Sequence, residues 1–128
     1  MPADADRLAE VLAARFDEVT PDEIHVTAGD GMLWYSSDVD SGKAGSYVRY
    51  ILEAADESDE ANLVRAAVMI LDQLQDFVSE ATTDPWPGTG RQPEPHGEIR
   101  DGALHLWYGD LGDIKLTIAP IDTADILS

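Results

Sequence analysis

The chain has 128 residues, no cysteine, and 26 acidic against 8 basic side chains, which gives a net charge of −18. A domain of this length can bury a core without disulfides or metals, and the lack of cysteine excludes thiol catalysis and cysteine zinc sites. The charge repels phosphate backbones and anionic lipids, so we expect neither nucleic acid nor membrane as a partner. Such a charge often serves solubility alone; the more specific interpretations are a basic protein partner and mimicry of DNA.

The first residues and the apolar runs of the sequence indicate the cellular compartment. Residues 1–6 lack the basic start and apolar stretch of a signal peptide, and the longest aliphatic run, residues 66–71, is too short to span a bilayer. We therefore expect a cytoplasmic protein.

The first third of the chain predicts a helix followed by a β-hairpin. Apolar side chains recur at helical spacing as far as residue 17, behind a capping aspartate that is either Asp4 or Asp6. Alternating apolar and polar residues then flank Asp30 and Gly31, a dipeptide that tolerates the positive φ angles of a type I′ turn.

The middle of the chain contains its strongest helical pattern. Residues 59–81 place apolar side chains at steps of three and four around a wide face, which predicts a long central helix that could be covered on two sides. Residues 47–55 suit either a strand or a short helix, with helix favoured. Residues 84–97 are rich in proline and glycine and predict a long irregular loop.

A second hairpin and a final strand complete the predicted fold. Residues 98–100 pair with residues 103–108 about Asp101 and Gly102, and a strand over residues 114–118 follows. We predict a single α+β domain over residues 1–128. Its mainly antiparallel sheet has about five strands, formed by the two Asp-Gly hairpins and the C-terminal strand, and packs on two or three helices.

The two turns fix the register of both hairpins, so the residues on each side of the predicted sheet can be named. The core side receives aliphatic residues and one tyrosine: Val26, Leu33, Tyr35, Ile99, Leu104, Leu106, Leu116 and Ile118. The outer side receives two tryptophans and the three histidines: Trp34, Trp107, His25, His96 and His105.

An exposed sheet face with two tryptophans is typical of an interaction site. The alternative is that the loop around Trp86, or residues 47–55, covers this face as a second small core. The Trp86 ring, held between two prolines, either packs on the domain or is presented outward. The candidate interaction surface comprises Trp34, Trp107, Trp86, His25 and His105.

One group of residues has the composition of a metal site. His96, Glu98 and His105 lie on one side of the second predicted hairpin, and two histidines with a carboxylate form the ligand set of a facial triad. A cross-strand charge pair between Glu98 and His105 explains the same residues without a metal.

No motif indicates a catalytic residue or a cofactor, and we expect none. The function we expect is that of a small acidic, non-enzymatic protein-interaction module whose partner is a protein, basic in charge, or a second copy of the chain. The alternative is a small ligand- or metal-binding enzyme-like domain using His96, Glu98 and His105. Acidic α+β domains of this size are similar in general character to bacterial secretion chaperones and immunity proteins, a likeness of size and charge that no motif carries.

Overall fold

The computed structural model describes residues 4–38, 43–54, 57–88 and 92–127 of the chain. Three helices and six strands form within these residues, and a 3-10 turn follows the last strand. In chain order they are α1 (Ala5–Asp17), β1 (Ile24–Gly29), β2 (Met32–Ser37), β3 (Lys43–Tyr47), α2 (Val48–Glu53), α3 (Asp59–Thr82), β4 (Pro95–Arg100), β5 (Ala103–Asp110), β6 (Asp113–Asp122) and the turn Thr123–Asp125.

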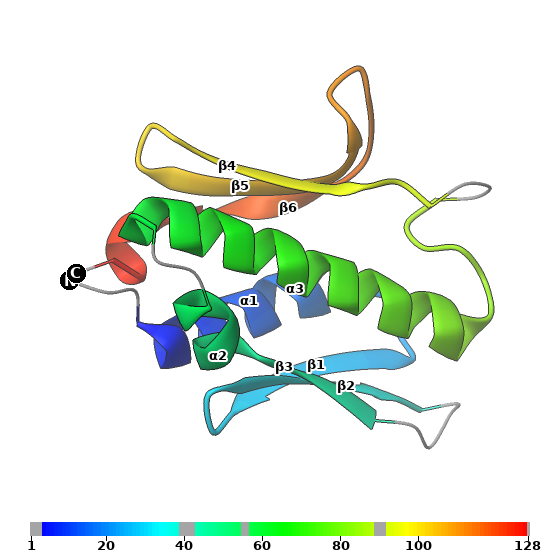
Figure 1. Ribbon diagram of the computed structural model, residues 1–128. Helices are drawn as coiled ribbons and strands as arrows, with labels where there is room; N and C mark the ends of the chain where they lie inside the picture. Colours follow the sequence, from blue (N-terminus) through cyan, green and yellow to red (C-terminus); the bar gives the residue numbers. More distant parts are fainter. Residues whose placement is uncertain (1–3, 39–42, 55–56, 89–91, 128) are drawn as a thin grey trace.

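The strands form two sheets rather than the one that the sequence predicts. The α+β class and antiparallel pairing are confirmed, but the described strands are ordered β1-β2-β3 in one sheet and β4-β5-β6 in the other. The helices lie between the two sheets (Figure 1). The prediction of about five strands in one sheet is therefore wrong.

The physical reason for two sheets lies in α3. Its buried residues spread around a wide arc of the helix: Leu63, Ala66, Ala67, Ile70, Leu71, Leu74, Gln75 and Val78. A sheet covers only one side of a helix, so a helix that is apolar on two sides is best buried by a second sheet. Within the described residues, no helix is both long enough and apolar enough to cross a membrane.

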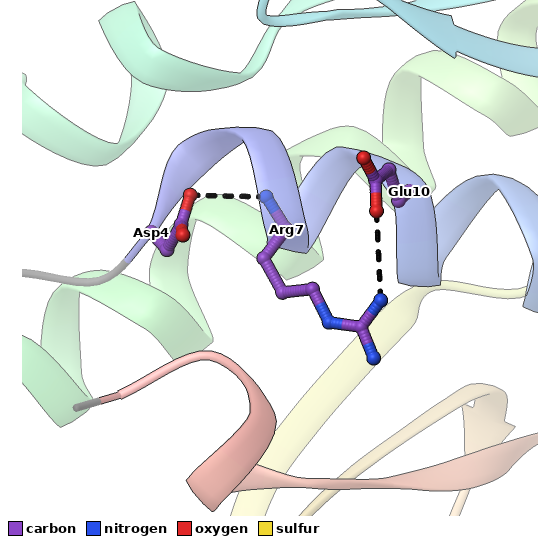
Figure 2. A network of polar contacts seen from close by, with 3 residues as sticks. All are labelled: Asp4, Arg7 and Glu10. Atoms are coloured by element: carbon purple, nitrogen blue, oxygen red, sulfur yellow. Dashed lines mark hydrogen bonds and ion pairs between the residues drawn. The ribbon is translucent and has the colours of Figure 1, made fainter.

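The first helix begins where the sequence predicts. The Asp4 carboxylate accepts a hydrogen bond of 3.1 Å from the Arg7 backbone N–H, which caps the helix, and the Arg7 guanidinium lies 3.5 Å from Glu10 (Figure 2). Its buried face contains Leu8, Leu12 and Phe16, at helical spacing.

Both hairpins have the predicted turns and the predicted register. Asp30 and Gly31 have φ angles of 54° and 73°, and Asp101 and Gly102 have φ angles of 53° and 76°, which are the two positive values of a type I′ turn. The cross-strand pairs agree with the register that these turns set: Val26 with Tyr35, Thr27 with Trp34, Ile99 with Leu104, Glu98 with His105 and His96 with Trp107. The core side of each hairpin faces the helices, although the two hairpins belong to different sheets.

Two segments differ from the sequence prediction in detail. Within residues 47–55 the favoured helix forms, as α2 from Val48 to Glu53, whereas Tyr47 is the last residue of β3 and residue 55 lies outside the described residues. Strand β4 begins at Pro95, inside the predicted loop over residues 84–97; residues 89–91 of that loop lie outside the described residues. Pro95 is tolerated because β4 is an edge strand, where every second backbone N–H points away from the neighbouring strand; Glu94 accepts a hydrogen bond from Gly109, so position 95 is one of the outward positions.

Candidate interaction surface

The outer face of the first sheet carries exposed aromatic side chains. Trp34 of β2 and Tyr47 of β3 point away from the helices, because strand alternation places them opposite their buried neighbours Tyr35 and Ser46. Trp34 is 43% exposed and Tyr47 is 64% exposed. Trp34 thus lies on the outer face that the hairpin register predicts.

A glycine allows the tryptophan to lie flat over the sheet. Gly45 faces Trp34 across β2 and β3, and a Cβ atom at Gly45 would lie 2.8 Å from Met32 Cε and 3.2 Å from Trp34 Cε3. Both side chains therefore occupy the space above the β3 backbone that a larger residue would fill. We call Met32, Trp34 and Tyr47 the aromatic face.

An open groove with a volume of about 800 Å³ adjoins the aromatic face. Its walls are the first half of α1, the turn between β1 and β2, and the chain from the end of β3 through α2, which lie at the same end of the molecule (Figure 1). The Val48 N–H donates a 3.2 Å hydrogen bond to the Gly31 carbonyl and so ties α2 to the turn. Met32 and Tyr47 line the groove as well, so groove and face are continuous.

The charged lining of the groove is mostly acidic. Among the residues that the structure describes, its charged lining consists of one cation, Arg49, and four acidic residues, Asp6, Glu10, Asp30 and Glu53. Arg49 lies 3.6 Å from Asp6, and Glu10 contacts Arg7 at 3.5 Å. Within the described part of the chain, Asp30 and Glu53 form no ion pair, so two carboxylates of the groove are uncompensated.

The aromatic lining of the groove includes a second exposed tyrosine. Tyr50, on the first turn of α2, is 76% exposed and lines the groove, as Tyr47 does. Aromatic rings beside uncompensated carboxylates form a surface that attracts cations through both the ring face and the charge.

His25 lies on the same outer face as Trp34, in an ion pair. Its Nε2 is 2.9 Å from the Asp38 carboxylate. This hydrogen bond raises the pKa of His25 above its usual value of 6.5, with a further contribution from the charges of Asp38 and Asp17. The cationic form of the ring is therefore favoured on this face.

The outer face of the second sheet is less open. Trp107 is half-buried, and its ring stacks on His96 with the centroids 5.7 Å apart. Glu98 is held by Arg100 at 2.8 Å, and His105, half-buried, lies opposite Glu98. The tryptophan of this sheet is thus engaged with its own neighbours, whereas Trp34 is available.

The three candidate metal ligands lie on one face but do not form a metal-binding group. His96, Glu98 and His105 share the outer side of the second sheet, as the register predicts. Among the residues that the structure describes, no three His, Asp or Glu side chains are placed to hold a metal ion. His96 faces the Trp107 ring and Glu98 faces Arg100, so the geometry favours stacking and a charge pair over coordination.

Trp86 packs on the domain. Its ring meets the buried Tyr108 edge-on with the centroids 5.4 Å apart, and its backbone N–H donates to the Ser79 hydroxyl of α3 at 3.2 Å. Of the two positions expected for Trp86, packed on the domain or presented outward, the structure has the first. The ring packs against the core rather than forming part of an open surface.

The groove and its tyrosines were not found by sequence reasoning. Tyr47, Arg49 and Tyr50 fall in the segment that suited both a strand and a helix, and their exposure depends on where that change occurs. One feature of the sequence could have indicated them. Ser46 is small and polar, and an edge strand that turns Ser46 inward turns the large side chain of Tyr47 outward.

Comparison of the chain with protein-family models, with curated proteins and with solved structures finds no match.

Proposed function

We propose that the chain is a non-enzymatic protein-interaction module that binds its partner through the aromatic face of the first sheet. The observation that supports this proposal is the exposure of Trp34. Its ring packs close to Gly45 of the neighbouring strand, and Met32 and Tyr47 lie beside it on the same face. Tryptophan and tyrosine are enriched at the centres of protein interfaces, where a rigid ring buries a large area at low entropic cost.

A heterologous partner is favoured over a second copy. The charge of −18 on each chain makes two copies repel at low salt, whereas it attracts a basic partner. The charge also argues against nucleic acid and anionic membranes as the bound surface.

The test is affinity capture from native lysate with the wild type and with Trp34→Ala. We expect Trp34→Ala to lose the captured protein, because removing an anchoring tryptophan commonly costs about 2 kcal/mol or more of binding energy. Circular dichroism checks that the variant stays folded, and sedimentation of the pure protein checks for self-association.

Trp107→Ala is the matched control, because it removes the same side chain from the outer face of the other sheet. It should keep the captured protein. If Trp34→Ala is folded and retains every partner, or if both variants lose the same partners, the aromatic face is not the binding surface.

A further inference from the structure

The groove beside the aromatic face has a charge and an aromatic lining that the proposed function does not yet use. We propose that it binds a basic, partly apolar peptide segment of the partner protein, with an arginine or lysine side chain held between the tyrosines and the uncompensated carboxylates. This inference rests on the proposed function, since the groove and the aromatic face would hold adjoining parts of one partner.

The first argument is the match of charge. Asp30 and Glu53 are the carboxylates of the groove without an ion pair in the described part of the chain, and Arg49 is already paired with Asp6. A cation in the groove would gain charge-assisted hydrogen bonds to carboxylates. A second copy of this chain, with 26 acidic side chains, would add repulsion instead.

The second argument is the aromatic lining. Tyr50 is 76% exposed and Tyr47 is 64% exposed, and both line the groove. Arginine and lysine bind over aromatic ring faces, and this attraction adds to that of nearby carboxylates. The arrangement thus favours a cationic side chain over a neutral or acidic one.

The third argument is size and continuity. A volume of about 800 Å³ lies within the range of about 300–1,000 Å³ that is typical of pockets for small ligands. Because Met32 and Tyr47 belong to both surfaces, a peptide held in the groove continues directly onto the aromatic face. Apolar residues of the same segment would cover Trp34, which explains the requirement for a partly apolar sequence.

The experiment measures binding of three short labelled peptides by fluorescence anisotropy. One alternates arginine with leucine, one replaces arginine by glutamate, and one replaces leucine by serine. We expect the arginine–leucine peptide to bind, the glutamate peptide not to bind, and the serine peptide to bind more weakly. Affinity should fall as salt is raised from about 50 mM to about 500 mM, because exposed charges are then screened.

Groove variants have matched controls elsewhere in the chain. Asp30→Asn removes a groove carboxylate, and Asp101→Asn makes the same change at the equivalent turn of the other hairpin; both positions have positive φ angles that asparagine tolerates. Tyr50→Ala removes an exposed groove ring, and Leu111→Ala removes a similarly exposed apolar side chain outside the groove.

We expect Asp30→Asn to weaken binding about twofold to fivefold at low salt. Tyr50→Ala should weaken binding by a similar factor, about twofold to fivefold. Asp101→Asn and Leu111→Ala should leave the affinity unchanged. Equal losses with Asp30→Asn and Asp101→Asn would mean that the net charge alone attracts the peptide, and the groove assignment would be wrong.

The failure of this inference is distinguishable from that of the proposed function, because Trp34 does not line the groove. If capture depends on Trp34 while the peptide is insensitive to Asp30 and Tyr50, the interaction module stands and the basic occupant of the groove is rejected. If no peptide binds and Trp34→Ala retains every captured partner, both proposals are rejected.

Discussion

At the scale of single residues, two buried tyrosines tie the sheets to α3. The Tyr108 hydroxyl of the second sheet donates a 2.7 Å hydrogen bond to the Leu71 carbonyl. The Tyr35 hydroxyl of the first sheet lies 2.6 Å from Ser46 Oγ, which in turn donates to the Gln73 side chain of α3. Burial raises the pKa of Tyr35 to about 12, so the hydroxyl keeps its proton over the physiological range.

We predict that Tyr108→Phe lowers the free energy of unfolding by about 1 kcal/mol, because it removes one buried hydrogen bond without changing the ring. Tyr35→Phe should cost less, because Ser46 and Gln73 remain bonded to each other. Urea denaturation measures both. Tyr50→Phe, on an exposed ring, is the control and should have no effect. A larger loss for Tyr35→Phe than for Tyr108→Phe would contradict this account.

His25 provides a prediction on pH. Its folded pKa is raised above 6.5, chiefly by the hydrogen bond to Asp38, so the stabilising pair is complete below pH 6.5 and is lost as the pH rises through the folded pKa. We predict that Asp38→Asn lowers the NMR titration midpoint of His25. Asp113→Asn, which neutralises a carboxylate on the other sheet, should leave the midpoint unchanged. Equal midpoints in wild type and Asp38→Asn would show that the pair does not form.

At the scale of elements, close approach of α3 to β4 depends on Gly97. A Cβ atom at Gly97 would lie 2.9 Å from Leu106 Cδ2 and 3.0 Å from Val68 Cγ2 of the helix. We predict that Gly97→Ala destabilises the protein by about 1–3 kcal/mol, because the side chains of Leu106 and Val68 must move within a packed core. Urea denaturation tests this.

Gly112→Ala is the control for Gly97→Ala. A Cβ atom at Gly112 would meet no atom within 4 Å, so its substitution should change stability little by packing. If Gly97→Ala is as stable as Gly112→Ala, α3 and β4 are not as closely packed as their backbones indicate.

The elements predicted from sequence are those whose causes are local. The register of each hairpin follows from its own Asp-Gly turn, and α1 and α3 follow from periodic apolar residues with a cap. Whether the two hairpins share a sheet is not a local property, since it depends on which side of α3 each one covers. The sequence does not predict strand β3, for a related reason. Gly45 and Ser46 have low strand propensity, and what holds them is non-local: Gly45 pairs with Trp34, and Ser46 is hydrogen-bonded to the Tyr35 hydroxyl.

In the candidate site, too, some features have local causes in the sequence and others depend on how the elements pack. The outward position of Trp34 follows from the turn at Asp30, because alternation fixes its side. The groove requires α1, the turn and α2 to meet, and Asp6 and Glu53 are far apart in sequence. No local pattern brings these carboxylates together with Tyr50.

At the scale of the whole molecule, the chain repeats one plan. A helix is followed by a three-stranded antiparallel sheet twice, α1 with β1-β2-β3 and α3 with β4-β5-β6. The repeated Asp-Gly turns occupy the same place in each half, and the pair His25–Ser36 corresponds in register to the pair His96–Trp107. The outer faces of the two halves differ, because the first leaves its tryptophan exposed while the second stacks its tryptophan on a histidine.

Because α3 is buried by both sheets, we predict that the two halves unfold together. Tyr35 reaches α3 through Ser46 and Gln73, and Tyr108 bonds directly to Leu71, so neither sheet can leave without exposing the helix to water. Two single-tryptophan proteins test this prediction. The one that retains Trp34 reports on the first sheet, and the one that retains Trp107 reports on the second. Both carry Trp86→Phe, so any loss of stability from that substitution is common to the two proteins.

Urea transitions of the two single-tryptophan proteins, followed by fluorescence and by circular dichroism, should each be a single step in which the two probes coincide. The alternative is a chain whose first sheet opens while α3 and the second sheet persist. The Trp34 fluorescence would then change at lower urea than the helical signal of the same protein, and the shared central helix would not be what couples the two halves.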